Sequence, residues 1–195
     1  DNLLIEVNGP EMPIFDGSAK IIAENLKKTG TSIQNKMKSA LIIKNEVKVS
    51  LKDGSFAKLT PSNGLEISVS IDFKDCAIGK QKFYYKNDIN NFFNEIFDAR
   101  TFCCLSDVEL MRNSGLAMGG SLENAIVVDE GNVLNPEGLR SKDEFVRHKV
   151  LDCLGDLFLI GMPLRGKLTA HKPGHKLSQK LLKELFKNPN SFIIE

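Results

Sequence analysis

Residues 143–158 read DEFVRHKVLDCLGDLF, which is the strongest helical pattern in the chain. Apolar residues recur at intervals of three or four, as on the buried face of an amphipathic helix, so the pattern predicts a helix over residues 143–160. Asp143 and Glu144 suit its N-terminus through capping and the helix dipole. The face predicted to be buried carries Val146, Val150, Leu151, Leu154, Leu157 and Phe158.

The opposite face of this helix carries three side chains that can take part in chemistry. At about 100° per residue, His148, Asp152 and Asp156 fall within roughly an 80° arc, one turn apart. A histidine and an aspartate at positions i and i+4 leave the same face about 6 Å apart and can reach one metal ion. The same spacing also occurs in ordinary surface ion pairs, so the helix alone leaves both interpretations open.

The rest of the chain mixes strand and helix patterns without a regular βαβ repeat. Asp53 and Gly54 lie between two alternating runs and predict a hairpin. We therefore expect an α+β fold in which antiparallel strands are backed by helices, with a linker at residues 33–39. Strands are predicted at residues 3–7, 40–43, 46–51, 55–61, 65–73, 83–85, 125–129 and 167–171, and further helices at residues 19–28, 89–97 and 178–187.

Composition excludes several classes of protein. With 195 residues, of which 42% are hydrophobic, the chain can form one globular domain or slightly more. A net charge of +1 gives no electrostatic case for binding nucleic acid or an anionic membrane. No apolar run reaches the length of about 18 residues that a membrane span needs. The four cysteines form no C-x-x-C pair, which is typical of reduced thiols in a cytoplasmic protein.

Three further segments are candidates for function, each with an ordinary alternative. His175 follows Pro173-Gly174 in a predicted loop that suits proton transfer, although it also fits a solvated loop histidine. Thr101 offers a hydroxyl near a predicted helix end, where simple packing is the alternative. The double glycine at residues 119–120 matches neither the dinucleotide nor the P-loop pattern. His171 lies only four residues before His175, so histidine alone does not single out a site.

Taken in order, these pieces resemble one family. The motifs are ARTF at 99–102, GGS at 119–121, AIVVD at 125–129, VLN at 133–135, GLR at 138–140, DEFVRHK at 143–149, LD at 151–152, GDL at 155–157 and GH at 174–175. They resemble the zinc-dependent UDP-3-O-acyl-N-acetylglucosamine deacetylases of bacterial lipid A biosynthesis. Residues 1–19 resemble the end of that family's first domain, so the resemblance covers essentially the whole chain.

The resemblance implies a domain organisation. Residues 36–195 would form a two-layer sheet-and-helix second domain, with a β-α-β insert at about 103–135 that forms an acyl-chain passage. Residues 1–35 would be the C-terminal remnant of a similar first domain, with exposed apolar surface. The family's first zinc ligand and its general base form an E-H pair that would lie upstream of Asp1. We therefore expect an N-terminally truncated chain with two zinc ligands and no obvious base.

The resemblance also implies catalytic roles. His148 and Asp152 match two of the three protein ligands of Zn²⁺. His175 matches a general acid, and Asp156 matches the carboxylate that orients and charges it. Thr101 matches the hydroxyl that stabilises the tetrahedral oxyanion.

The implied partner is a small molecule, a UDP-sugar with an acyl chain. Phe102 and Lys149 match positions that contact the sugar nucleotide. The acyl-chain passage would be lined by Cys104, Val108, Ala117, Ser121 and Val127.

The implied activity is that of a zinc-dependent amidohydrolase. It would hydrolyse the acetamide of the substrate to acetate and UDP-3-O-acyl-glucosamine, the committed step of lipid A biosynthesis, in the cytoplasm of a Gram-negative bacterium. We expect a monomer, because nothing in the sequence marks an interface. The main alternative is a catalytically incomplete fragment that only binds the sugar nucleotide or acyl chain. A decayed gene product and a different metal hydrolase built on the same helix also remain open.

Overall fold

The fold is mixed α+β, as predicted. The computed structural model describes residues 2–73, 77–108 and 119–195. Seven strands form one sheet: β1 (Leu41–Ile43), β2 (Val47–Ser50), β3 (Phe56–Thr60), β4 (Leu65–Phe73), β5 (Gly79–Lys86), β9 (Leu164–His171) and β10 (Phe192–Ile194). A second sheet contains β6 (Phe102–Cys104), β7 (Ile126–Asp129) and β8 (Asn132–Val133). The main helices are α1 (Lys20–Thr29), α4 (Glu144–Leu157) and α5 (His175–Lys187).

Several shorter helical turns lie between these elements. The predicted helix at 89–97 is a single turn, α2 (Ile89–Asn91), that continues as a π-helical turn, η1 (Phe92–Ile96). The end of the predicted helix at 143–160 is a 3₁₀ turn, η2 (Phe158–Ile160), and a further turn, η3 (Pro189–Ser191), precedes β10.

Strand β9 lies in the middle of the large sheet. On one side it pairs in parallel with β4; on the other it pairs first with β1 in parallel and then with β3 antiparallel. The expected antiparallel pairing therefore holds for β1–β10, β2–β3, β3–β9 and β4–β5, but not for the pairings of β9 with β1 and β4. The chain reaches β9 from the β4–β5 hairpin through α4, and such a helical crossover permits a parallel pairing that a tight turn does not.

Gly166 marks the point at which β9 passes from β1 to β3. A Cβ at this position would lie 2.7 Å from Ile43 Cγ1, and the Thr60 carbonyl oxygen would be 3.3 Å away. Two strand ends can meet beside one strand here because Gly166 has no side chain.

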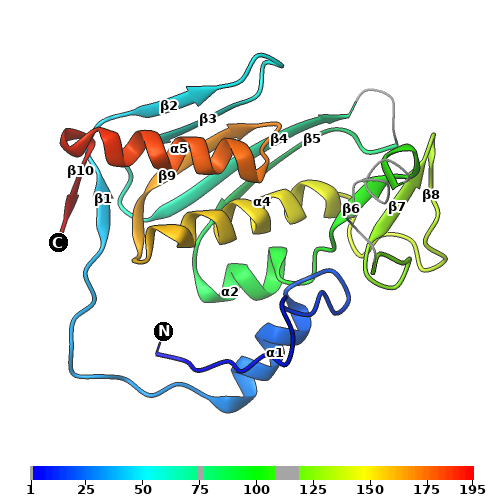
Figure 1. Cartoon of the computed structure of the whole chain (residues 1–195), viewed down its shortest axis with the longest axis horizontal. Coiled ribbons are helices and arrows are strands. Elements are labelled where there is room, and N and C mark those ends of the chain that lie inside the picture. Colours follow the sequence, from blue (N-terminus) through cyan, green and yellow to red (C-terminus); the bar gives the residue numbers. More distant parts are fainter. Residues whose placement is uncertain (1, 74–76, 109–118) are drawn as a thin grey trace.

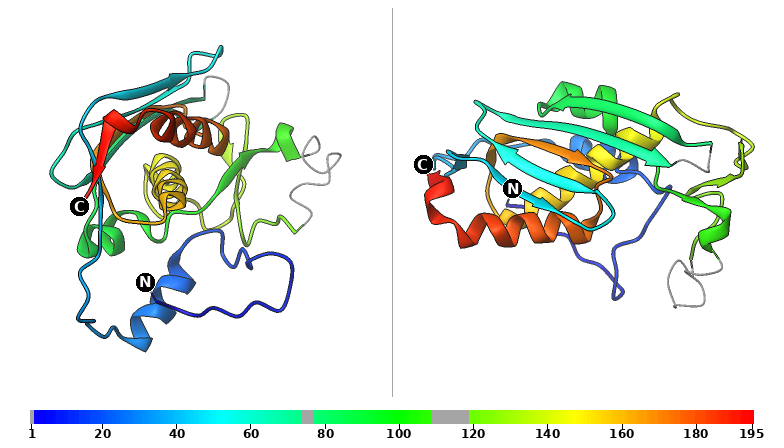
Figure 2. Two further views of the ribbon diagram at one scale, coloured as in Figure 1. Left: turned by 60° about the vertical axis from the view of Figure 1, so that its left-hand side comes forward. Right: turned by 90° about the horizontal axis from the view of Figure 1, so that it is seen from above.

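Helices α4 and α5 cover one face of this sheet (Figure 1). The core lies between them and the strands, where Ile67 and Val69 of β4 and Val146 and Val150 of α4 are buried to 1% exposure or less. In Figures 1 and 2, α1 lies away from the sheet, and none of its residues is buried. None of the helices in the described residues has the length and apolar character that a membrane span requires.

Several boundaries differ from the prediction for physical reasons. Residues 3–7 form no strand and Leu4 is 83% exposed, because β-rich composition yields a strand only where another strand pairs with it. Phe158, predicted to be buried, is 65% exposed. It begins η2, where each residue turns by about 120° instead of 100° and the helical face is lost. The short strands β6, β8 and β10 were not predicted.

Candidate metal centre

Two potential metal ligands face each other on α4. The distance between His148 Nε2 and Asp152 Oδ1 is 3.3 Å. Two ligands at zinc's usual bond lengths of about 2.0–2.1 Å, arranged tetrahedrally, lie ~3.3 Å apart. The pair therefore fits two corners of a zinc coordination tetrahedron.

The His148 ring is held in the orientation that metal binding requires. Its Nδ1 lies 2.9 Å from the Ala99 carbonyl oxygen. Because a carbonyl only accepts, Nδ1 carries a proton, and Nε2 is the ring nitrogen that faces Asp152 and that a metal ion would bind. Histidine ligands of metals commonly donate their second nitrogen to such an acceptor. His148 is 7% exposed, so this arrangement is shielded from water.

Asp152 is held as a carboxylate. Burial raises its pKa, but the hydrogen bond and charge of His148, followed by the charge of Lys149, outweigh burial and hold the pKa well below its usual range. Lys149 Nζ donates to Asp152 Oδ2 at 2.8 Å. The other carboxylate oxygen, Oδ1, faces His148. An ionised aspartate of this kind is a good zinc ligand.

The two residues expected to contact the sugar nucleotide lie beside this pair. Lys149 Nζ sits 5.0 Å from the centre of the Phe102 ring. The Phe102 ring in turn packs edge-on against Phe145 and His148, at centroid distances of 5.0 and 6.3 Å. Strand β6 thus brings an aromatic ring, and helix α4 a cation, to the candidate metal ligands.

His175 and Asp156 form a second pair. Their Nδ1 and Oδ1 atoms are 2.9 Å apart, and the Asp156 side chain is 13% exposed whereas His175 is 68% exposed. Among the residues that the structure describes, the other oxygen, Asp156 Oδ2, is buried without a hydrogen-bond partner. His175 was predicted to lie in a loop, but it is the first residue of α5. The helix begins this early because its buried face already starts at Leu177. The pairing leaves His175 Nε2 as the ring atom that can exchange a proton.

Thr101 lies where three chain segments meet. Its N–H donates to the Gly17 carbonyl at 2.8 Å, and its carbonyl accepts from Ile126 N–H at 2.8 Å. Gly17 has φ +80°, and a Cβ there would lie 2.0 Å from the Asn124 carbonyl oxygen, so only glycine allows this approach. Thr101 immediately precedes Phe102, and the backbone therefore carries it to the edge of the site.

The expected acyl-passage residues are partly described. Cys104 lies in β6 and Val127 in β7, which run in parallel with Cys103 opposite Val127. Val108 is half-buried in a helical segment, and Ser121 is exposed in a turn. Ala117 lies outside the described residues.

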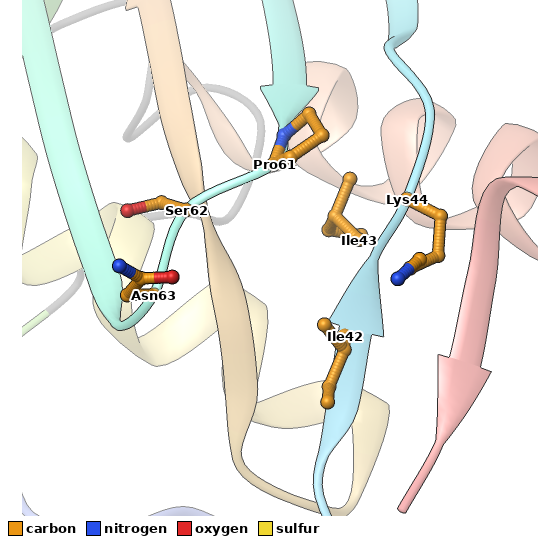
Figure 3. Close-up of a pocket in the computed structure, with 6 residues that line it drawn as sticks. All are labelled: Ile42, Ile43, Lys44, Pro61, Ser62 and Asn63. Atoms are coloured by element: carbon orange, nitrogen blue, oxygen red, sulfur yellow. The ribbon is translucent and has the colours of Figure 1, made fainter.

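The chemistry-bearing residues gather at α4, and the other features lie apart. The hollow in Figure 3 is lined by Ile42, Ile43, Lys44, Pro61, Ser62 and Asn63, and none of these is a candidate residue. Within the described residues, no third His, Cys, Asp or Glu joins His148 and Asp152.

Sequence reasoning missed one part of the site. Glu144 was interpreted as a residue that complements the helix dipole, and Asp143 as a cap. The structure buries Glu144 completely against Arg100, while Asp143 pairs with Arg147 and makes no cap hydrogen bond. The signal was present, since Glu144 lies four residues before His148, in register with Asp152 and Asp156.

A His–Asp pair at zinc-ligand spacing is the kind of donor set that metal-dependent hydrolases use. Residues 1–187 match the family model described as LpxC, UDP-3-O-acyl N-acetylglycosamine deacetylase. The chain belongs to this family, which confirms the resemblance.

Similar proteins agree with this assignment. The UDP-3-O-acyl-N-acetylglucosamine deacetylase of Syntrophus aciditrophicus is 46% identical over 192 residues, which are 98% of this chain and 61% of the relative. That of Myxococcus xanthus is 47% identical over 194 residues, which are 100% of this chain and 62% of the relative. The chain thus spans about three fifths of the length of these curated relatives.

Proposed function

We propose that this chain carries the zinc-binding part of a deacetylase that hydrolyses the acetamide of UDP-3-O-acyl-N-acetylglucosamine. The products are acetate and UDP-3-O-acyl-glucosamine, in the lipid A pathway of a Gram-negative cytoplasm. The observation that carries the proposal is the 3.3 Å separation of His148 Nε2 and Asp152 Oδ1, in a member of this family.

His148 and Asp152 would hold the zinc ion. When bound, zinc supplies Lewis acidity that polarises the acetamide carbonyl and makes a water molecule more acidic. The Thr101 hydroxyl donates to the oxygen on which negative charge develops as water adds to the carbonyl. His175 Nε2 gives its proton to the departing sugar amine, while Asp156 holds the ring through Nδ1.

Substrate contacts follow from the neighbouring side chains. The Lys149 ammonium attracts a phosphate of the nucleotide, and the Phe102 ring packs against the sugar. Cys104, Val108, Val127, Ser121 and Ala117 line the path of the acyl chain.

Within the described residues, two metal donors come together instead of three. This observation also favours the second candidate function, a fragment that binds the sugar nucleotide without hydrolysing it.

The test is acetate release from UDP-3-O-acyl-N-acetylglucosamine during a zinc titration. His148→Ala should abolish zinc-dependent release, whereas His171→Ala should retain it, because His171 lies in β9 with Nδ1 2.8 Å from Ser70 Oγ. Nucleotide binding without release would select the second candidate. An absence of both zinc and nucleotide binding would refute the proposal.

A further inference from the structure

Residues 99–101 lie between the candidate metal ligand and the rest of the fold. The Ala99 carbonyl receives the His148 Nδ1 hydrogen bond at 2.9 Å. Two residues later, Thr101 N–H is bonded to the Gly17 carbonyl at 2.8 Å. The orientation of the His148 ring therefore depends on how firmly this short segment is held.

The segment is held by Glu144 through Arg100. Glu144 Oε1 accepts from the Arg100 backbone N–H at 3.0 Å and from Nε at 2.9 Å, and Oε2 accepts from Nη2 at 3.2 Å. Oε2 also accepts from Arg140 N–H at 2.6 Å. The Arg100 guanidinium additionally donates to the Gly138 carbonyl at 2.7 Å and forms an ion pair with Glu137.

Both members of this ion pair are shielded from solvent. Glu144 is 0% and Arg100 is 2% exposed. The hydrogen bond from Glu144 raises the pKa of Arg100, so the guanidinium is charged. A buried ion pair is tolerated when its remaining polar atoms are bonded, as here, and removal of one partner leaves an uncompensated charge. We call this ion pair of Glu144 and Arg100 the clamp, because its hydrogen bonds hold residues 99–101 in place.

The clamp and the metal ligand share one row of α4. Glu144, His148, Asp152 and Asp156 follow each other at intervals of four residues, along one side of the helix. Glu144 therefore bonds to residues 99–101 one helical turn before His148, and His148 contacts the same segment at the Ala99 carbonyl.

We propose that Glu144, acting through Arg100, is a positioning residue that holds the Ala99 carbonyl and so fixes the tautomer and orientation of the His148 ring. Its effect on metal binding rests on the proposed function, whereas its effect on the His148 ring does not.

The first test observes the ring without metal. In ¹⁵N-labelled full chain, the His148 Nδ1–H should give a slowly exchanging imidazole signal. Glu144→Gln replaces one acceptor oxygen by an amide donor that faces the N–H groups of Arg100 and Arg140, so exchange of this proton should accelerate at least about 10-fold. Glu137→Gln is the matched control. Glu137 also pairs with Arg100, but its side chain is 55% exposed, and the signal should be unchanged.

The second test measures zinc affinity by competition with a chelator. Loss of a residue that supports a metal-bound histidine typically weakens binding 10–100-fold, and we expect about 10-fold for Glu144→Gln and less than about twofold for Glu137→Gln. If Glu144→Gln does not fold, Arg100→Lys keeps the charge but loses the fork of hydrogen bonds, and it should show the same loss of protection at His148.

The outcomes separate the two proposals. An unchanged His148 Nδ1–H signal in folded Glu144→Gln overturns the positioning role, whatever the metal result. A wild-type chain that binds no zinc overturns the proposed function, while faster exchange in Glu144→Gln but not in Glu137→Gln still establishes the clamp.

Discussion

Asn135 shows how a single side chain shapes the expected acyl passage. It is 4% exposed, and its Oδ1 accepts from Val127 N–H at 2.9 Å. Its Nδ2 donates to the carbonyls of Leu122 and Ala125, at 2.8 and 2.9 Å. One amide therefore bonds the start of β7 and the turn that precedes it. Glu144 does the same for residues 99–101, and in both cases a buried polar side chain bonds backbone groups that have no strand partner.

Asn135→Leu is therefore expected to destabilise the fold although it adds apolar surface. The Val127 N–H and two carbonyls lose their partner, and each buried unpaired group costs about 1–3 kcal/mol, so the unfolding free energy should fall by at least about 3 kcal/mol. Urea denaturation measures this change. Asn132→Leu, at an exposed position of β8, is the matched control and should change stability by less than about 0.5 kcal/mol. Equal effects at both positions would contradict the bonding role.

At the scale of elements, the N-terminal segment contacts the rest of the molecule through the turn at residues 16–18. Asp16 pairs with Arg140 at 2.9 Å and accepts from the Ser18 hydroxyl at 2.9 Å. Arg140 Nη1 also donates to the Asp98 carbonyl at 2.7 Å. The turn therefore attaches the segment that contains α1 to the loop that leads into β6.

This docking should depend on pH. Burial raises the pKa of Asp16, but hydrogen bonds from Ser18 and then Arg140 outweigh it and lower the pKa from its ordinary value of 3.8. The contribution of Asp16 is thus complete above that unfolded value and is lost as the pH falls through the folded pKa. The exchange protection factor of Thr101 N–H, which reports docking to Gly17, should fall in that window, by the equivalent of up to ~1 kcal/mol. Asp16→Asn should remove the pH dependence, and a persistent fall in that variant would disprove the assignment.

The sequence predicted those elements whose signal is local. The strand at residues 65–73 and the helix at 143–160 follow from period-two and period-3.6 patterns, and both are present with small shifts. Strand β10 was missed because its three residues become a strand only by pairing with β1, where Ile43 meets Phe192 across the chain. Residues 3–7 show the converse case, a strand pattern to which the described residues offer no partner strand.

The candidate site follows the same rule. The spacing of His148 and Asp152 places them on one helical face, and the structure sets them 3.3 Å apart. The four-residue spacing from His148 could have placed Glu144 on the same row of the helix, but its partner Arg100 lies 44 positions away, so no local pattern could identify that partner.

At the scale of the whole molecule, the core and the N-terminal segment differ in how far their apolar side chains are buried. The hydrophobic core cluster begins at Leu41 among the described residues. Many apolar side chains before it are exposed, among them Leu4 at 83%, Ile33 at 98% and Met37 at 94%. The expectation of exposed apolar surface in residues 1–35 is confirmed by Leu3, Leu4, Ile5 and Ile33.

The division of the chain near residue 35 can be tested by deletion. Removing residues 1–35 takes away the Gly17–Thr101 hydrogen bond, worth about 1 kcal/mol, and a partly exposed ion pair, worth about 0–1 kcal/mol, but no core side chain. The remaining chain should therefore unfold cooperatively in urea, with a loss of no more than about 2 kcal/mol. A matched pair of variants sets the scale: Leu41→Ala, at 0% exposure, should cost about 2–5 kcal/mol, and Leu4→Ala less than about 0.5 kcal/mol. A deleted chain that unfolds without cooperativity would mean that the N-terminal segment contributes to the core, because removal of surface contacts alone leaves the packing between α4 and the sheet intact.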